Sequence, residues 1–296
     1  MTVRKQFNEA ADAHRAAVGF LEQARQHLDV QDDVPLPDAS RKLITQLAEA
    51  ATVITPGWLG QALSRAATDI PLGTATSDEP LAVRIGDCVA AEDARFPAVV
   101  NVLGTGHLAI ESDTDDSRAR SIIQSVPLRL LASRPADSMS VSFIDARHGG
   151  ETFAGFAPLV DAGMVSATAV DGAGVSQVLA EAESHLDTAR RRGSATADLP
   201  ERLVVIAGLP NLSPTVTERI NSLATAGPKA RLHFVVAGWR AATLDTATYV
   251  AMTDDRVTVA GVPYPVRIDS APEFSLIHRV CTELAESGQW LIGDIT

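Results

Sequence analysis

The sequence has 296 residues, a formal net charge of −12 at pH 7, 46% hydrophobic residues and 21% charged residues. This balance excludes wholesale disorder, and so acidic a chain is not drawn to nucleic acid or anionic lipid by its overall field. Two cysteines, Cys88 and Cys281, are too far apart for a zinc site or a disulfide framework. Because there is no secretory leader and no apolar run of about 18 residues, we expect a cytoplasmic protein without membrane insertion.

Residues 1–72 are predicted to form a helical segment, arranged as a hairpin or a coiled-coil-like pair. Between Val3 and Leu28, small and apolar residues recur every three or four positions, which is typical of one face of an amphipathic helix. This face consists of Ala10, His14, Ala17, Val18, Leu21, Ala24 and Leu28. Such a helix can pack against the rest of the chain or offer a face to a partner, and the pattern does not decide between the two.

A second and a third helix are predicted within the same segment. Pro35 and Pro37 break the first pattern, and Asp38 or Ser40 can cap the helix that follows. The apolar positions of this second helix are Leu43, Ile44, Leu47, Ala50 and Val53. A short third helix is predicted over residues 58–67, directly after a Pro-Gly pair.

The stretch 71–80, PLGTATSDEP, has the composition of a linker, and residues 80–296 are predicted to form one α/β domain. Short β-rich runs alternate with helical patterns, which favours βαβ units and a mostly parallel central sheet in a three-layer fold. The predicted strands are 82–85, 98–102, 107–110, 141–144, 203–207 and 232–237. The predicted helices are 117–131, 175–191, 214–226 and 273–285.

Four segments in order carry the strongest functional signal. A strand that begins at His107 runs into an acidic loop and a helix, two apolar strands follow at 141–145 and 203–209, and KARLHFVVAGWRA occupies 229–241. In this order they resemble the motor domain of the FtsK/SpoIIIE family of hexameric DNA and protein translocases, over about residues 80–270. The resemblance implies a P-loop NTPase-like fold of the RecA/FtsK kind.

The resemblance places a phosphate loop at residues 112–119, but its residues differ from those of a working loop. A working loop reads G-x-x-x-x-G-K-[ST]: its backbone N–H groups and Lys bind phosphate, and its hydroxyl binds Mg²⁺. Here Ala119 replaces the hydroxyl residue, and three carboxylates, those of Asp113, Asp115 and Asp116, fill the loop. The remnants of a nucleotide site would be Ser112 and Ser117 at the glycine positions, Arg118 at the Lys position, and Thr114.

The second half of the nucleotide site is also changed. The Asp-Glu pair that would support Mg²⁺ and activate water falls on Ala207 and Gly208, neither of which can do acid–base chemistry. Gly238 and Trp239 stand where the family has Thr-Gln, and we hypothesise that Trp239 fills the vacated pocket. We therefore expect no bound ATP, no metal, no other cofactor and no hydrolysis.

Two acidic clusters allow other interpretations. Asp113 and Asp115 follow a strand, as do the nucleophile and acid of haloacid-dehalogenase-like phosphatases, but the Gly-Thr or Gly-Val expected next is missing. The polar residues Asp145, Arg147, His148 and Glu151 lie in a Gly-rich stretch without a nucleophile motif, and we interpret them as a surface turn.

Three further features are interpreted as structural. The glycines at 172–174 precede a helix and are expected to form a turn and cap rather than an anion site. His107 and His233 lie in predicted strands and are expected to be core or strand-end residues. The basic run 190–192 is expected to complement a helix C-terminus.

By resemblance, the chain is expected to be a non-hydrolysing pseudo-ATPase that acts as a binding, docking or regulatory module. Degenerate copies in this family sit beside active ones, notably in type VII secretion motors. The expected partner is a protein, an FtsK-like motor or its cargo, contacted through the N-terminal helices. The alternatives are a DNA-associated translocase accessory, against which the acidic charge and the 4% aromatic content count, and a residual ATP-binding protein or enzyme.

Overall fold

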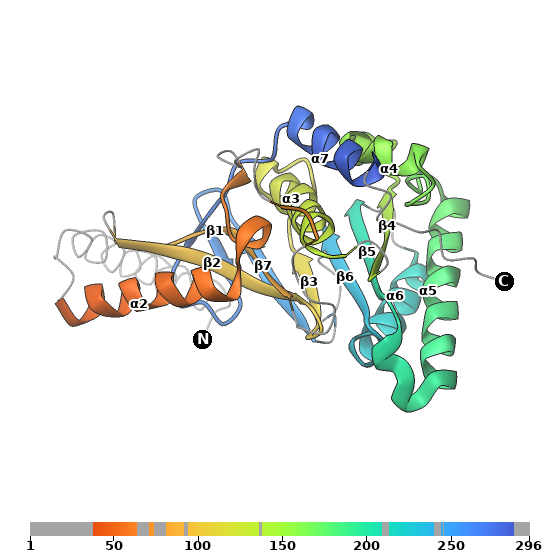
Figure 1. The fold of residues 1–296 in the computed structure, drawn as a ribbon, viewed down its shortest axis with the longest axis horizontal. Coiled ribbons are helices and arrows are strands. Elements are labelled where there is room, and N and C mark those ends of the chain that lie inside the picture. Colours follow the sequence, from red (N-terminus) through yellow and green to blue (C-terminus); the bar gives the residue numbers. More distant parts are fainter. Residues whose placement is uncertain are drawn as a thin grey trace, which may run out of the picture.

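A six-stranded sheet, parallel except for its last strand, lies at the centre of the fold (Figure 1). The computed structural model describes residues 38–63, 71–73, 81–91, 94–135, 138–208, 213–239, 244 and 246–286. The strand order is β4-β5-β6-β3-β7-β8. The strands are β3 (His107–Ile110), β4 (Met139–Asp145), β5 (Glu201–Gly208), β6 (Leu232–Ala237), β7 (Ala247–Met252) and β8 (Val257–Val259). Because β3 pairs with β6 on one side and β7 on the other, the loop that follows β3 lies in the middle of the sheet edge.

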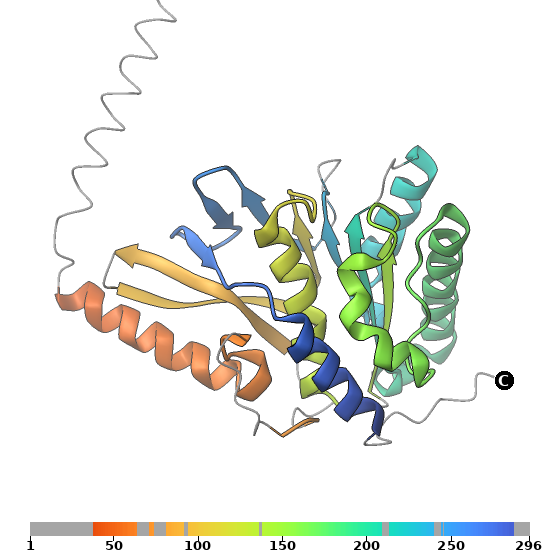
Figure 2. The ribbon, with the colours of Figure 1, turned by 90° about the horizontal axis from the view of Figure 1, so that it is seen from above.

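Helices cover both faces of this sheet, which gives the expected three layers (Figure 2). Alternate residues of each strand face opposite cores: Leu203 and Val205 belong to one cluster and Val204 and Ile206 to the other. On the first face lie α3 (Ser117–Ser133), η4 (Glu151–Phe156), α4 (Ala157–Asp161) and α7 (Phe274–Glu286). On the second lie α5 (Gly172–Arg192) and α6 (Pro214–Ala226), with the 3-10 turns η5 (Gly193–Asp198) and η6 (Pro228–Ala230) beside them.

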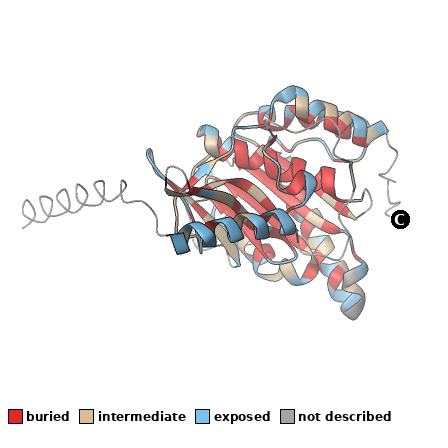
Figure 3. Cartoon of the chain, turned by 60° about the vertical axis from the view of Figure 1, so that its left-hand side comes forward, coloured by how far each residue is buried: buried red, intermediate tan, exposed pale blue. Residues whose placement is uncertain are grey.

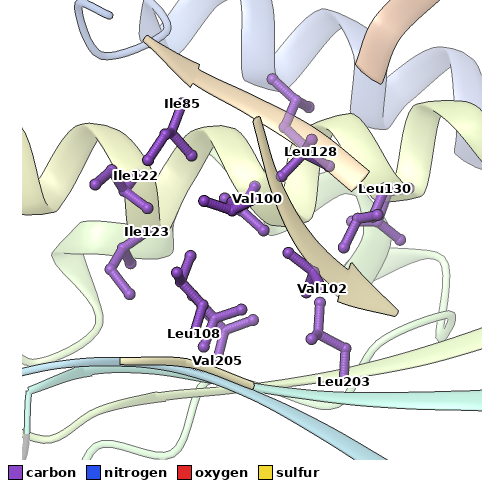
Figure 4. Packing of buried hydrophobic residues seen from close by; sticks show 14 of the residues in the cluster. Ile85, Val100, Val102, Leu108, Ile122, Ile123, Leu128, Leu130, Leu203 and Val205 are labelled. Carbon is purple, nitrogen blue, oxygen red and sulfur yellow. The ribbon is translucent and has the colours of Figure 1, made fainter. Parts of the chain in front are cut away.

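Helix α3 is buried between the large sheet and a second, smaller one (Figure 4). Its Ile123 and Leu130 pack among residues of both sheets, and most of its side chains, including Ala119 at its start, are buried. This helix begins at the candidate phosphate loop, so its burial fixes the position of that loop.

A second, smaller sheet accompanies the mostly parallel central sheet and was not predicted. It is antiparallel, in the order β2-β1-β9, and consists of β1 (Leu81–Ala91), β2 (Ala94–Leu103) and β9 (Val266–Ile268). Only residues 92–93 separate β1 from β2, and so short a connection can form a hairpin but not the crossover that parallel strands need.

The N-terminal part of the described chain consists of α2 (Asp38–Ile54) and η2 (Gly57–Leu59). Helix α2 confirms the second predicted helix and contacts β2, burying Ile44 and Ala51, while its outer surface is exposed (Figure 3). Of the third predicted helix only the 3-10 turn η2 is seen, and residues 64–67 lie outside the described part. The first predicted helix, residues 3–28, also lies outside it, as do linker residues 74–80.

The predicted helices of the α/β domain and the predicted strands of the large sheet agree with the structure to within three residues, whereas β1 extends six residues beyond the predicted 82–85 and β2 begins four residues before the predicted 98–102. The strands predicted at 107–110 and 232–237 and the helix at 214–226 have the predicted bounds. The three-residue strands β8 and β9 and the five-residue helix α4 were not predicted, because so few residues establish no period. The six-residue strand β7, ATYVAM, was also missed, because it lacks the continuous apolar run of β6. Cys88 and Cys281 are buried and free. None of the helices in the described part is both long and apolar enough to cross a membrane.

Candidate functional site

The candidate phosphate loop begins after β3 and ends at the N-cap of α3. Asp116 is this N-cap: its Oδ1 accepts the backbone N–H of Arg118 at 2.9 Å. Helix N-termini attract anions because their first N–H groups have no partner within the helix. In this chain the carboxylate of Asp116 occupies that place.

Arg118, at the position of the phosphate-binding Lys, is held by the same carboxylate. Its Nη2 lies 2.6 Å from Asp116 Oδ2 and its Nε 3.0 Å from Oδ1, while Nη1 donates to the carbonyl of Thr253 at 2.9 Å. The hydrogen bond between the two side chains raises the pKa of Arg118 and lowers the pKa of Asp116. The guanidinium that the sequence suggested for phosphate is thus directed to groups of the chain itself.

The two other loop aspartates are bridged by side chains from the turn that follows β4. Nη1 of Arg147 donates to Asp113 Oδ2 at 2.8 Å, and its Nη2 pairs with Asp115 Oδ2. His148 Nε2 lies 2.9 Å from Asp115 Oδ1, and this contact, together with the charge of Arg147, lowers the pKa of Asp115. We call these four residues, Asp113, Asp115, Arg147 and His148, the loop clasp.

Asp145 supports the loop clasp, and its burial contradicts the expectation that it belongs to a surface turn. Its side chain is fully buried, and its carboxylate accepts the backbone N–H groups of His148 at 3.1 Å and Thr152 at 3.0 Å. Its Oδ1 also lies 3.2 Å from His148 Nδ1. Since buried carboxylates persist where such donors satisfy them, Asp145 fixes the turn that presents Arg147 and His148 to the loop.

Thr114 and Ser112 tie the loop to neighbouring strands rather than facing outward as ligands. The buried Thr114 hydroxyl donates to the carbonyl of Ala207 at 3.1 Å and also contacts His148 Nδ1 at 3.3 Å. The carbonyl of Ser112 accepts the N–H of Gly238 at 2.9 Å. Ser117 is exposed on the first turn of α3. The structure therefore brings the predicted site residues into one loop, but most of their polar groups are used internally.

The end of β5 explains how the turn after β4 reaches the loop. A Cβ atom placed on Gly208 would lie 3.1 Å from Cβ and 3.4 Å from Cδ of Arg147. The aliphatic part of the Arg147 side chain thus passes over Gly208, one of the two positions at which the sequence resemblance places the acidic pair. A larger side chain at residue 208 would require the Arg147 side chain to shift by a few tenths of an ångström.

The residues at this site do not fit a magnesium–nucleotide complex. Ala119 offers no hydroxyl and is fully buried, and Ala207 and Gly208 offer no carboxylate. In the described part of the chain, no group of three or more His, Cys, Asp or Glu side chains is placed to hold a metal ion.

Trp239 is buried in the core on the α5–α6 side of the sheet, and its backbone N–H donates to the carbonyl of Ile110. That it takes the place of a nucleotide stays a hypothesis. The glycines at 172 and 174 lie in the first turn of α5, which Asp171 caps: Gly174 N–H donates to Asp171 Oδ1 at 2.8 Å. His107 and His233 are fully buried, as expected of core residues.

Comparison with protein-family models and with curated proteins gives no match. Among solved structures, the chain is similar to EccC of Thermomonospora curvata (ATPases 2 and 3, in complex with a signal sequence peptide), with 19% identity and a TM-score of 0.52. The match covers 76% of this chain and 51% of that one, so the chain spans about half the length of EccC in that structure. The cytoplasmic domain of EssC is also similar, with 14% identity, a TM-score of 0.48 and coverage of 71% and 46%.

The likeness to EccC concerns the fold. It confirms the predicted α/β fold of the P-loop NTPase-like kind, with a mostly parallel sheet.

Proposed function

We propose that this chain is a non-hydrolysing pseudo-ATPase of the FtsK/SpoIIIE type that serves as a binding or regulatory module for another protein. The observation that carries the proposal is the bridging of Asp113 and Asp115 by Arg147. In this proposal, the bridge occupies the phosphate-binding place of the motors that the sequence resembles, and it does so with charged groups of the chain itself.

A triphosphate would have to displace these internal ion pairs. Each carboxylate left about 4 Å from a phosphate oxygen opposes binding by roughly 1–4 kcal/mol at the dielectric of water or of a protein surface. Arg118 offsets little of this, because Asp116 and the carbonyl of Thr253 already hold its guanidinium. Without a place for Mg²⁺, we assign no catalytic step to this chain.

A protein partner is supported by the similar structure and by the charge of the chain. EccC is a secretion ATPase that was solved with a signal sequence peptide. We extend this to a partner of the same kind here, an active motor or its cargo, with the N-terminal helices of residues 1–72 as the docking element. A net charge of −12 counts against the alternative, an accessory that binds DNA.

Calorimetric titration with ATP and Mg²⁺ tests the first half of the proposal. The natural chain should give no heat of binding up to millimolar nucleotide and no phosphate release. The double variant Asp113→Asn, Asp115→Asn removes two opposing charges and frees Arg147, so weak binding should emerge. Asp187→Asn alters an exposed aspartate paired with Arg190 on α5. It is the matched control and should give no heat of binding. Micromolar binding to the natural chain would make it a nucleotide sensor instead.

The second half is tested with a fluorescently labelled signal sequence peptide and, separately, with a purified type VII secretion ATPase. A saturable change in anisotropy with the peptide would identify cargo as the partner. Co-elution with the ATPase would identify the motor. Binding of neither, together with salt-dependent binding of duplex DNA, would favour the DNA-associated alternative.

A further inference from the structure

The imidazole ring of His148 lies between two carboxylates that belong to different parts of the site. Its Nε2 is 2.9 Å from Oδ1 of Asp115, in the loop after β3, and its Nδ1 is 3.2 Å from Oδ1 of Asp145, at the end of β4. The side chain of Asp115 is 56% exposed, whereas that of Asp145 is fully buried and that of His148 is 19% exposed. The ring therefore connects an exposed side chain of the loop to a buried group of the sheet.

These two contacts decide how many protons the ring carries. A neutral imidazole has one N–H and one lone pair, so it donates to only one of the two carboxylates and turns its lone pair toward the other. Thr114 does not relieve this conflict, because its hydroxyl donates to the carbonyl of Ala207 and so offers only an acceptor to Nδ1, at 3.3 Å. Both contacts are satisfied when both ring nitrogens are protonated.

The charges around the ring also favour the protonated form. Two carboxylates contact the ring, and the contact with His148 lowers the pKa of Asp115, which keeps this carboxylate ionised. Arg147 opposes a positive ring, but its guanidinium is paired with Asp113 and Asp115. The charged residues on the elements that meet here are Asp113, Asp115 and Asp116 from the loop, Asp145 from β4, Arg147 from the turn, Glu151 from η4, and Arg118 and Arg120 from α3.

We propose that His148 is a proton-dependent latch, which holds the loop of residues 112–116 closed when its ring is protonated and releases Asp115 when the ring is neutral. The direction of release follows from burial. The carboxylate of Asp145 is fully buried, so an unprotonated Nδ1 would leave its oxygen facing a lone pair inside the protein. The carboxylate of Asp115 can turn into solvent instead. The single proton of the neutral ring therefore stays on Nδ1, and the contact between Nε2 and Asp115 breaks.

Opening of the latch releases a proton, so a rise in pH favours the open loop. Histidine side chains change charge between about pH 5 and pH 8, and the loop should respond in this range. Arg147 still bridges Asp113 and Asp115 in the open form, so we expect greater motion of residues 113–116 rather than an unfolded loop. This inference goes beyond the proposed function, since the latch acts in the isolated chain and requires neither ATP nor a partner.

NMR of the isotopically labelled full chain tests the latch between about pH 5 and pH 8. Long-range proton–nitrogen spectra distinguish the imidazolium form of His148 from its two neutral forms. Both ring nitrogens should be protonated at the acidic end of the range, and Nδ1 alone at the alkaline end. The order parameters of amides 113–116 should fall with the same midpoint, from about 0.85 toward about 0.6. The N–H of Asp115, which donates to Asp113 Oδ1 at 3.1 Å, reports directly on the closed loop.

The variant Asp115→Asn removes the negative partner of the ring and leaves the ring itself in place. The midpoint of the His148 titration should fall by about 0.3–0.7 pH units, and the order of the loop should no longer change with pH. Asp187→Asn, at an exposed aspartate on α5, is the matched control and should leave both unchanged. Unchanged amide signals of β5 show that the core is intact in both variants.

Three results would each overturn the proposal. The first is a neutral ring that carries its proton on Nε2. The second is a ring of His148 whose charge does not change over this pH range. The third is a loop whose order depends on pH to the same extent in the natural chain and in Asp115→Asn. None of these results bears on ATP binding, so the latch can fail while the proposed function stands.

Discussion

The Nη1 atom of Arg147 lies 2.8 Å from Oδ2 of Asp113, although β5 and β6 separate the strands that lead to these two residues. Three strand spacings amount to roughly 14 Å. The contact is possible because the turn after β4 folds over the end of β5, where Gly208 has no side chain. The ion pair therefore lies across the edge of the sheet at which parallel α/β folds bind their ligands.

The first prediction concerns how much the Arg147 ion pairs contribute to the free energy of unfolding. Replacing Arg147 by Ala should lower the free energy of unfolding by only about 0.2–1 kcal/mol, because the guanidinium and its partners are partly exposed and screened. Urea denaturation measures the change, with Arg190→Ala on α5 as an exposed ion-pair control. A loss above about 2 kcal/mol would show that the clasp supports the fold as well as closing the loop.

Asp145 should behave very differently from the exposed clasp residues. In Asp145→Asn one carboxylate oxygen becomes an NH₂ group that faces the N–H of His148 or Thr152, which leaves buried donors opposed to each other. A loss of about 1–3 kcal/mol of stability is expected. The same substitution at the exposed Asp187 should change stability by less than about 0.5 kcal/mol. Equal effects at both positions would mean that Asp145 is not satisfied as the structure shows.

The contrast between these residues shows what the sequence could and could not predict. The strand that begins at His107 and the helix that begins at Pro214 follow from local signals: an apolar run, a capping Ser213 and a first-turn proline. The position of β3 between β6 and β7 was not predicted and is known from the structure.

The partners of the loop could not be predicted in the same way. Asp145 and Arg147 look like a polar turn in the sequence, because their burial and reach depend on a strand end some sixty residues later in the chain. One signal was available: the loop carries three carboxylates, and such a concentration calls for cations in the fold. The basic pair of Arg147 and His148, placed directly after a strand, was the natural candidate.

Arg129 provides a prediction about how the N-terminal part is attached. Its fully buried guanidinium donates from Nη1 to the carbonyls of Trp58 at 2.7 Å and Gln61 at 2.5 Å, so that it ties η2 to α3. Arg129→Ala leaves both carbonyls without this donor and opens a cavity, and we expect a loss of about 3–5 kcal/mol. Arg129→Met, which fills the volume, should recover part of it.

Hydrogen exchange locates this effect. In a destabilised but folded Arg129→Met variant, amides of residues 57–63 should exchange faster while those of β5 stay protected. Faster exchange throughout the chain would show instead that Arg129 supports the whole core rather than the attachment of η2.

His107 should make stability depend on pH. It is fully buried, with Nε2 donating to the carbonyl of Ala224 and Nδ1 accepting the N–H of Phe234, so the neutral ring satisfies both contacts. Burial, reinforced by the neighbouring His233, lowers the pKa of His107 to about 4 from the ordinary 6.5. Between these values the unfolded chain binds more protons than the folded one. The stabilising contribution is therefore complete above pH 6.5 and is lost as the pH falls toward 4.

Denaturation at a series of pH values measures this contribution. The free energy of unfolding should fall by about 3 kcal/mol between pH 7 and pH 4 on account of His107, since each pKa unit corresponds to about 1.4 kcal/mol. In His107→Gln, whose amide also offers a donor and an acceptor, the overall stability should be lower but the fall with pH smaller. His278→Gln on the exposed side of α7 should keep the full pH dependence. Identical pH profiles for the natural chain and His107→Gln would show that protonation of this ring does not oppose folding.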